Sequence, residues 1–515
     1  MNPYWQLNGS KLWQGHVIDK LRDLLTGSVQ CAITSPPYWG LRAYLGDQAV
    51  EWGPVSYAPM AGLAEIEVPA WRGCLGLEPT PEMFVAHIVL VARELWRVLR
   101  GDGCCWLNLG DSYAAQGGGK KAGQYDGMGH VNAGAAVGAC DERARRAPFG
   151  LKPKDLIGIP WRVALALQAD GWYLRSPIVW AKGLSFCPTY AGSCMPESVT
   201  DRPTRAHEMV FLLAKNERYF YDHVAVRETA VGGTPGNVTH KGKTAYENGD
   251  KFMRTKVGLT EMGPSTSRNL RDTWVVNPGG YKANHYATFP PDLIRPMILA
   301  GTSAKGACPD CGSPWERVVA SKSNWHERAA AGATAGNVGV ADTYQNAVHG
   351  EGMSHDLGGP STTLGWIPSC SCYGVEIPEK FRLPDEPDDA VEPFECEACG
   401  GSGLEEPLPM FPDMETPCHK CKGKGQRPGN DVWEQWQAEC AEAQANRMAV
   451  LESIKDLNLP TVPCVVLDPF CGSGTTPIEA VRLGRNGWGI ELSKDYCDEH
   501  IIPRMEKPIA MEMTL

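Results

Sequence analysis

The sequence lacks several features that would place the protein in other classes. It has no run of 18 apolar residues and no signal peptide at its amino terminus, so we expect no membrane partner and a cytoplasmic location. It also has no excess of positive charge, because 49 Lys and Arg residues stand against 60 Asp and Glu residues, a net charge of −11. In a reducing compartment its 19 cysteines are expected to be thiols, and metal sites account for them better than disulfides.

A short apolar run at residues 29–33 ends in Thr34-Ser35-Pro36-Pro37-Tyr38. Neither proline can donate to a sheet, so the run predicts a buried strand that stops at a rigid loop, at the edge where open α/β sheets bind ligands. The Ser35 hydroxyl and the Pro36 carbonyl can accept hydrogen bonds from an amino group, and Tyr38 offers a flat face on which a nucleic-acid base could stack. Taken alone, the motif is equally compatible with an ordinary proline turn.

A second short strand is predicted at residues 464–467, before Asp468 and a glycine-rich turn. The turn lacks the dinucleotide-binding pattern G-x-G-x-x-G, but glycines between a strand and a helix let a ligand approach the backbone closely. A helix over 477–483 and a strand over 487–491 should follow. Glu491 ends that strand about 20 residues past the turn, the spacing at which an acid binds ribose hydroxyls in dinucleotide-binding units.

Asp468-Pro469-Phe470-Cys471-Gly472-Ser473-Gly474-Thr475 resembles the S-adenosylmethionine loop of amino-methyltransferases. Because Ser-Pro-Pro-Tyr precedes this loop, the chain resembles the β class of site-specific DNA amino-methyltransferases, over roughly residues 1–300 and 460–515. The resemblance implies an α/β, Rossmann-like, seven-stranded methyltransferase sheet that is circularly permuted. It also implies a catalytic loop of Ser35, Pro36, Pro37 and Tyr38, and cofactor contacts from Asp468, Phe470, Gly472, Gly474, Thr475 and Glu491.

Other segments are similar to the same family. Leu12-Trp13-Gln14-Gly15 should add a cofactor-side strand, followed by His16 where the family commonly has an acid. Residues 195–208 also resemble the family, and residues 285–293 resemble its cofactor lid. Apolar spacing also predicts regular elements in the first half of the chain. They are a helix over 81–100 ended by Gly101, a strand over 103–109, a helix over 158–169, and strands over 172–180 and 209–214.

Two groups of cysteines have the spacing of structural zinc sites. Cys308 and Cys311 with Cys370 and Cys372 supply four thiolates in two close pairs. Cys396, Cys399, Cys418 and Cys421 lie in two copies of Cys-x-x-Cys-x-Gly-x-Gly, which resemble half of a DnaJ-type cysteine-rich domain. Four thiolates leave no open position on the metal, so one or two zinc ions with a structural role are expected.

The negative charge is concentrated in one segment. Residues 376–460 hold 19 acidic and eight basic residues, which leaves 41 of each sign elsewhere. Residues 117–154 and 231–285 are basic and are the segments expected to contact double-stranded DNA, although a solvated loop is nearly as compatible with 117–154. The acidic segment could serve as an interaction module, a mimic of DNA charge or a spacer.

The expected order of domains follows from these motifs. The catalytic half of the methyltransferase domain is predicted at 1–230, a target-recognition region at 231–284 and the lid at 285–301. The first zinc insert is predicted at 302–375, the acidic cysteine-rich insert at 376–430, a connecting helix at 431–460 and the cofactor-binding half at 461–515.

Cytosine N4 is favoured as the methylated atom, because a serine before Pro-Pro-Tyr more often accompanies it in the family, and adenine N6 is the alternative. An RNA amino-methyltransferase and a non-catalytic, zinc-bearing DNA-binding protein also remain open. A cytosine C5 enzyme is disfavoured, because it needs a nucleophilic cysteine and the nearby Pro463-Cys464 begins a strand before the cofactor loop. The sequence gives no recognition site, oligomeric state or partner nuclease.

Overall fold

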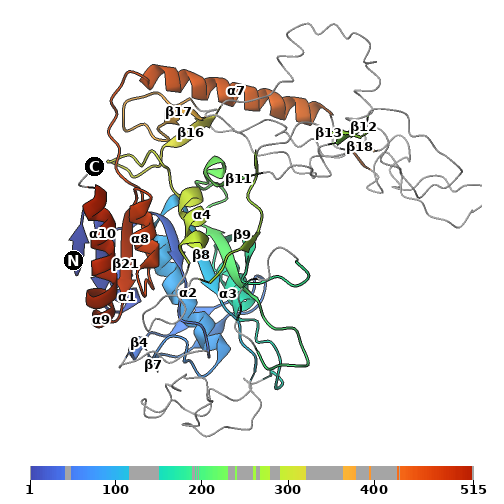
Figure 1. The fold of residues 1–515 in the computed structure, drawn as a ribbon, viewed down its shortest axis with the longest axis vertical. Helices are drawn as coiled ribbons and strands as arrows, with labels where there is room; N and C mark the ends of the chain where they lie inside the picture. Colours follow the sequence, from blue (N-terminus) through green and yellow to red (C-terminus); the bar gives the residue numbers. More distant parts are fainter. Residues whose placement is uncertain are drawn as a thin grey trace, which may run out of the picture. The chain divides into compact units, whose positions relative to one another are not determined.

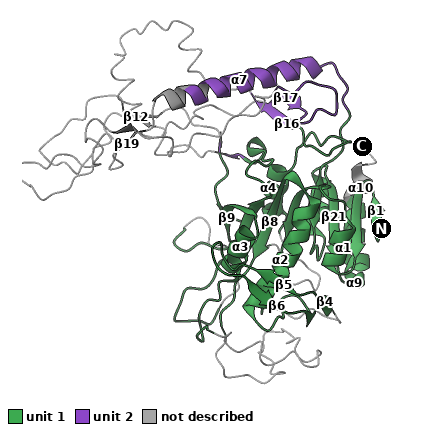
Figure 2. Ribbon diagram, turned by 180° about the vertical axis from the view of Figure 1, so that it is seen from behind, with its two compact units in different colours: residues 1–226, 269–315, 460–515 green, residues 227–268, 316–459 purple. Residues whose placement is uncertain are grey.

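The computed structural model describes residues 2–40, 48–114, 150–187, 192, 194, 197–229, 238–240, 259–261, 267–278, 290–319, 363–378, 394–395, 426–427 and 430–512. The chain divides into two compact units (Figure 2). Unit 1 comprises residues 1–226, 269–315 and 460–515, and unit 2 comprises residues 227–268 and 316–459. Of the described residues, no helix is long and apolar enough to cross a membrane.

Unit 1 is built on one sheet, which has nine strands in the described part of the chain (Figure 1). Their order is β1 (Trp5–Leu7), β2 (Ser10–Gln14), β21 (Asn486–Glu491), β20 (Val465–Asp468), β3 (Val29–Thr34), β8 (Leu99–Leu109), β10 (His207–Ala214), β9 (Tyr173–Ala181) and β15 (Thr273–Val275). The strands from β2 to β8 in this order are parallel, and β10 is antiparallel to both of its neighbours. Strands from the two ends of the sequence therefore lie side by side in the middle of the sheet.

Helices cover both faces of the sheet, because the strands in its middle are apolar on both sides. In β3, Ala32 packs into the cluster that contains α1 (Val17–Asp23), α2 (Pro81–Val98) and α3 (Ile159–Ala169). The neighbouring Cys31 and Ile33 face the opposite cluster, with α4 (Pro291–Gly301). On that side α8 (Thr475–Arg482) contacts α4 and also packs with α10 (Ile502–Glu512). The predicted α/β class is thus confirmed.

Smaller elements complete unit 1. They are the strand pairs β4 (Val50–Trp52) with β7 (Trp71–Gly73) and β5 (Val55–Tyr57) with β6 (Ile66–Val68), the 3-10 helix η3 (His223–Val226), and the short helices α9 (Lys494–Tyr496) and η4 (Cys497–Ile501).

The structure corrects three sequence expectations. The sheet has nine strands in the described residues where seven were expected, because the short edge strands β1 and β15 extend it. The helix predicted over 81–100 ends at Val98, and β8 begins at Leu99 and runs through Gly101. Leu99 is fully buried and pairs with Val29, so sheet pairing prevails over helical spacing there. The helix predicted over 477–483 starts earlier, at Thr475, directly after the left-handed Gly474.

Two other predicted regions contribute to unit 1. Strand β15 lies within the expected target-recognition region but pairs with β9 at the edge of the main sheet. The described part of the expected lid is mainly helix α4, which buries Leu293, Ile294, Met297 and Ile298. Arg295 of α4 pairs with the buried Glu479 of α8 at 2.9 Å, so this helix is part of the sheet's covering layer.

The main body of unit 2 in the described residues is a hairpin covered by a long helix. Strands β16 (Glu316–Val319) and β17 (Thr363–Ile367) are antiparallel, and α7 (Asn430–Ile454) packs on them. Arg447 of α7 pairs with Glu316 at 2.6 Å. The other strand pairs of this unit are β11 (Glu228–Thr229) with β14 (Ser267–Arg268), β12 (Val238–His240) with β13 (Leu259–Glu261), and β18 (Phe394–Glu395) with β19 (Gln426–Arg427).

Candidate active site

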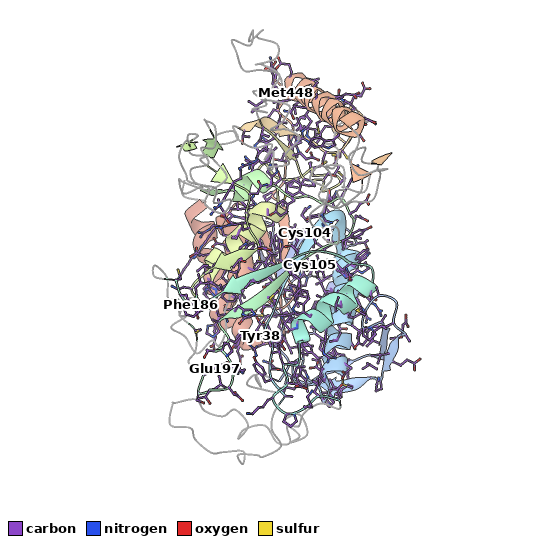
Figure 3. All side chains as sticks on the ribbon, turned by 90° about the vertical axis from the view of Figure 1, so that its right-hand side faces the viewer. Tyr38, Cys104, Cys105, Phe186, Glu197 and Met448 are labelled. Atoms are coloured by element: carbon purple, nitrogen blue, oxygen red, sulfur yellow. The ribbon has the colours of Figure 1, made fainter. Side chains whose placement is uncertain are left out.

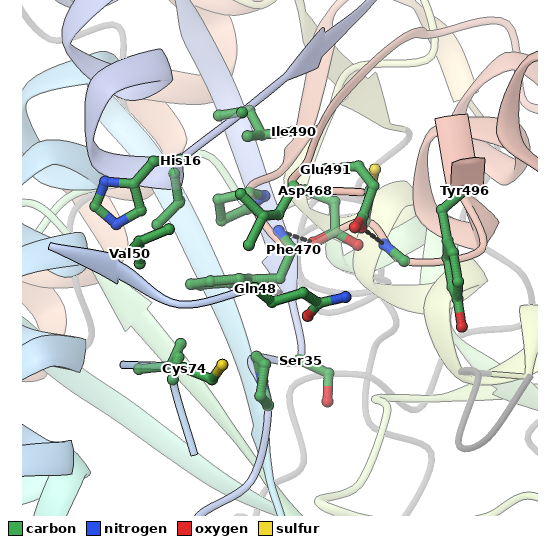
Figure 4. Close-up of a pocket in the computed structure, with 18 of the residues that line it drawn as sticks. His16, Ser35, Gln48, Val50, Cys74, Asp468, Phe470, Ile490, Glu491 and Tyr496 are labelled. Carbon is green, nitrogen blue, oxygen red and sulfur yellow. Dashed lines mark hydrogen bonds between the residues drawn. The ribbon is translucent and has the colours of Figure 1, made fainter. Parts of the chain in front are cut away.

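A pocket opens in unit 1 at the carboxyl ends of the parallel strands, where β2, β3, β20 and β21 pass into loops. It is lined by residues from both predicted motifs, namely Ser35 and Pro37 from the first and Asp468, Phe470, Gly472, Thr475 and Glu491 from the second. Figure 4 shows Phe470 and Gln48 between Ser35 on one side and the two carboxylates on the other. Residues predicted to serve chemistry and cofactor binding therefore share one cavity.

A direct hydrogen bond joins the strands that carry the two motifs. Thr34 Oγ1, immediately before Ser35, donates to Asp468 Oδ1 at 2.8 Å across 434 positions of sequence. The bond is buried, and β3 and β20 pair alongside it. The side-by-side strands fix the spacing between the Ser-Pro-Pro-Tyr loop and the glycine-rich turn.

Asp468 organises the glycine-rich turn. Its Oδ1 also accepts from the Phe470 amide at 3.0 Å, so one carboxylate oxygen holds both the neighbouring strand and the start of the turn. Burial raises the pKa of Asp468 to about 6, although the hydrogen bonds from Thr34 and the Phe470 amide act to lower it. Asp468 lines the pocket from a position that is almost completely buried.

Glu491 closes the opposite side of the same turn. Its carboxylate accepts from the Gly472 amide at 3.0 Å (Figure 4) and from the Ser493 amide at 2.9 Å. Burial raises the pKa of Glu491 to about 7, although these amide bonds favour the ionised form. The turn and the end of β21 thus present a carboxylate to the cavity at a fixed position.

Not every predicted cofactor residue lines the pocket. Gly474 instead caps α8 with a left-handed backbone (φ 77°), and a Cβ at this position would lie 2.8 Å from Ile501 Cγ2. The glycine is required here by the turn and by the close approach of η4. Thr475, the next residue, begins α8 and lines the pocket.

His16 forms part of the pocket wall where the resembled family has an acid. Its ring packs edge-on against Trp52, with centroids 4.9 Å apart, and its buried Nε2 has no hydrogen-bond partner among the described residues. Burial lowers the pKa of His16, so the ring is neutral near pH 7. This side of the pocket is aromatic and uncharged.

Tyr38 lies beside the pocket in a network of polar side chains. Its hydroxyl accepts from Ser35 Oγ at 3.1 Å and donates to Glu208 Oε2 at 2.7 Å. Asn108 Nδ2 donates to the same hydroxyl and to Glu208 Oε2, the latter at 2.9 Å, and Lys182 pairs with Glu208 Oε1. Figure 3 shows Tyr38 at the end of the sheet where Glu197 and Phe186 also lie.

The Tyr38 ring depends on a glycine that follows β8. A Cβ on Gly110 would lie 2.6 Å from both Cδ2 and Cε2 of the ring. A side chain at position 110 would therefore displace the ring.

A buried acid anchors the loop on its other side. Glu78 Oε2 accepts from the Gly76 amide at 2.8 Å, and the Glu78 carbonyl accepts from Trp39 Nε1 at 2.9 Å. His87 pairs with Glu78 Oε1 at 2.9 Å, and both side chains are fully buried. The pair holds the chain directly after Tyr38.

Four of the predicted zinc ligands come together. The sulfur atoms of Cys308, Cys311, Cys370 and Cys372 lie within 4.8 Å of one another. The loop that carries Cys311 is held by Gln30 Nε2, which donates to the Gly312 carbonyl at 2.9 Å. The second predicted set, Cys396, Cys399, Cys418 and Cys421, lies outside the described residues.

Several residues of the site were not predicted from sequence. They are Asn108 at the end of β8, Lys182 just after β9 and Glu208 in β10, together with the pocket-lining Gln48, Trp52 and Tyr496. Glu208 lay within a segment already seen to resemble the family, but polar residues at strand ends indicate a shared site only once the strand order is known.

This arrangement can bind a ligand whose hydroxyl groups donate to Glu491, and it can present hydrogen-bond acceptors to an amino group at Ser35.

The DNA methylase family N6_N4_Mtase matches residues 29–313 and 421–502. The chain belongs to this DNA methylase family. The expectation of a DNA methyltransferase is thereby confirmed at the level of the family.

Relatives of this DNA methylase include type II methyltransferases. It is 40% identical over 296 residues to M.XycI of Xanthomonas campestris pv. cyanopsidis, covering 58% of this chain and 74% of that protein. It is 39% identical over 297 residues to M.Cfr9I of Citrobacter freundii, with the same coverage. The solved cytosine-N4-specific PvuII DNA methyltransferase matches 96% of this chain and 86% of its own at 10% identity and a TM-score of 0.37, too low to add to the assignment.

Proposed function

We propose that this DNA methylase transfers a methyl group from S-adenosylmethionine to the exocyclic N4 of a cytosine flipped out of double-stranded DNA. The supporting observation is the pocket that Ser35 shares with Phe470, Asp468 and Glu491, held together by the Thr34–Asp468 hydrogen bond. Its carboxyl-edge position is where open α/β sheets bind ligands.

The residues of the glycine-rich turn fit the cofactor. Glu491 would accept from the ribose hydroxyls, the Phe470 ring would pack against the cofactor, and the neutral His16 and Trp52 form an aromatic wall. When bound, S-adenosylmethionine supplies an electrophilic methyl carbon: the C–S bond breaks with its electron pair left on sulfur, and the base nitrogen's lone pair forms the new N–C bond.

The catalytic loop would prepare the nitrogen for this attack. An exocyclic amine is a weak nucleophile because its lone pair is delocalised into the ring, and hydrogen bonds accepted from its N–H groups draw it toward tetrahedral geometry. Ser35 Oγ and the Pro36 carbonyl are the proposed acceptors. Pro37 keeps the loop rigid, and Tyr38 is proposed to stack on the extruded base, which contributes roughly 1–3 kcal/mol.

The strand order supports a circularly permuted methyltransferase sheet of the β class. The strand before the glycine-rich turn, β20, is near the end of the sequence yet pairs with β3 near its beginning. On this proposal 1–230 and 461–515 are the two halves of one domain, and the region between them holds target recognition and the inserts. The basic segments 117–154 and 231–285, proposed to contact DNA, lie largely outside the described residues.

A structural zinc ion is proposed for the Cys308, Cys311, Cys370 and Cys372 cluster. With Zn–S bonds of about 2.3 Å, tetrahedral thiolates are roughly 3.8 Å apart, which the observed limit of 4.8 Å accommodates. A second ion at Cys396, Cys399, Cys418 and Cys421 stays a prediction from their spacing. A cytoplasmic restriction–modification setting is proposed from the two type II relatives.

The test is to sequence, with detection of modified bases, the DNA of cells that express the protein and of cells that express Ser35→Ala. We expect N4-methylcytosine within one short motif, only with the unaltered protein. N6-methyladenine would establish the alternative base. If purified protein with bound cofactor labels structured RNA but not duplex DNA, or labels neither, the proposal is wrong.

A further inference from the structure

A chain of hydrogen bonds leads from the pocket to an ion pair behind it. Ser35 Oγ lines the pocket and lies 3.1 Å from Tyr38 Oη, which lies 2.7 Å from Glu208 Oε2. The other carboxylate oxygen, Oε1, pairs with Lys182 Nζ. Glu208 and Lys182 are largely buried, with side-chain exposures of 16% and 23%.

The chemistry of these groups determines which of them donates and which accepts in each hydrogen bond. A carboxylate paired with an ammonium group only accepts hydrogen bonds, so Tyr38 must donate its single proton to Glu208. The two lone pairs of the Tyr38 oxygen then accept from Ser35 and from Asn108 Nδ2. The Ser35 proton points away from the pocket. Ser35 Oγ also accepts from Asn108 Nδ2 at 3.5 Å, and its remaining lone pair is left for a ligand.

We propose that Glu208, set by Lys182, acts through Tyr38 to fix Ser35 as an acceptor toward the target amine and receives the proton that the amine loses. This inference rests on the proposed function. It assigns roles to residues outside the two motifs, and it explains how a serine hydroxyl, which is able to donate or accept, is restricted to the one direction that an amino group requires.

The proton can move along the same bonds. After methyl transfer the amine nitrogen carries a positive charge and a surplus proton. That proton passes to Ser35 Oγ as the Ser35 proton passes to Tyr38 Oη and the Tyr38 proton to Glu208 Oε2. The methylated base and both hydroxyls end neutral, and Glu208 ends as a carboxylic acid, which returns its proton to solvent.

Replacing Glu208 by glutamine reverses the direction of these hydrogen bonds without changing the size of the side chain. In Glu208→Gln the amide oxygen faces the Lys182 ammonium, so the amide nitrogen faces Tyr38 and donates to it. With Asn108 Nδ2 still donating to Tyr38 Oη, both lone pairs of that oxygen are occupied, so Tyr38 donates toward Ser35 and the Ser35 hydroxyl donates into the pocket. A pocket that presents a donor suits a carbonyl at the position of the amine, as in uracil.

The experiment measures binding as well as turnover. Duplexes that carry the mapped recognition site, with either cytosine or uracil at the target position, are titrated with protein saturated with S-adenosylhomocysteine. The ratio of the two Kd values is compared between variants on the same two duplexes, so that the energy of extruding each base cancels. We expect Glu208→Gln to shift the ratio toward uracil by about 10-fold and to lower kcat by about 100-fold, with KM for the cofactor unchanged.

Three further variants keep the test decisive. Glu208→Asp retains an acceptor and should keep the wild-type ratio at a reduced kcat. Glu94→Gln, which removes a partly buried carboxylate paired with Arg97 on α2 and remote from the pocket lining, should change neither quantity. If Glu208→Gln does not fold, Tyr38→Phe breaks the middle link and should shift the ratio in the same direction.

The two proposals fail in different ways. If the unaltered protein methylates no DNA, the proposed function is overturned. If it methylates DNA but Glu208→Gln keeps its ratio, or Glu208→Asp shifts the ratio as the amide does, the role of Glu208 is overturned and the proposed function stands.

Discussion

At the residue scale, each motif supplies side chains with a separable task. Ser35 and Tyr38 face the base on the proposed function, whereas Asp468 and Glu491 surround the glycine-rich turn. We expect Ser35→Ala or Tyr38→Ala to lower kcat on the order of 100-fold without a change in cofactor Kd. Single-turnover rates and calorimetric titration with S-adenosylhomocysteine separate the two quantities. A variant of either residue that weakens cofactor binding as much as turnover would contradict this division.

Glu491 should make cofactor affinity depend on pH. Its pKa is raised by burial to about 7, and an ionised carboxylate is the stronger acceptor for ribose hydroxyls. We expect affinity for S-adenosylhomocysteine to rise with pH up to about 7, by as much as roughly tenfold per unit, and to level above it. Glu491→Gln should bind weakly with no such rise. If Glu491→Ala leaves the Kd unchanged, the ribose contact is misassigned.

The ligand-free protein should respond to pH in the opposite direction through the same residue. The folded-state pKa of about 7 lies above the ordinary value of 4.5, so the native state holds the proton more tightly than the unfolded state. The contribution of Glu491 to the free energy of unfolding is therefore largest below about pH 4.5 and is lost as the pH rises through 7. Denaturant titrations of Glu491→Gln should show a smaller loss over this range.

At the scale of elements, β8 contributes to the site through its shape as well as its side chains. Gly110, directly after this strand, leaves room for the Tyr38 ring. We expect Gly110→Ala to displace the ring and lower kcat by at least about tenfold while the protein stays folded. Gly101→Ala in the same strand is the control, because its Cβ would meet Asn216 Nδ2 at 3.5 Å, an ordinary contact. Equal kinetics for the two variants, measured with duplex DNA, would argue against a role for the ring position.

At the scale of the whole molecule, the sheet assembles both ends of the sequence, and the four-cysteine cluster is proposed to hold a structural zinc ion. We expect purified protein to contain one or two equivalents of zinc by mass spectrometry of the metal. Cys308→Ser or Cys372→Ser should remove one equivalent and lower the melting temperature. Cys440→Ser is the matched control, since Cys440 is outside the cluster. Full stability in a metal-free preparation would contradict a structural metal.

The sequence by itself determined the two loops, the α/β class and the family, because proline and glycine restrict the backbone locally and apolar spacing reveals strands and helices. It placed Ser35, Asp468 and Glu491 at strand ends but did not locate Asn108, Lys182 or Glu208. Those residues lie in β8, directly after β9 and in β10, and only the pairing of β3 with β8, and of β10 with β8 and β9, brings them to Tyr38. Hydrogen bonding between strands is a long-range property, so tertiary structure decided how the site is completed.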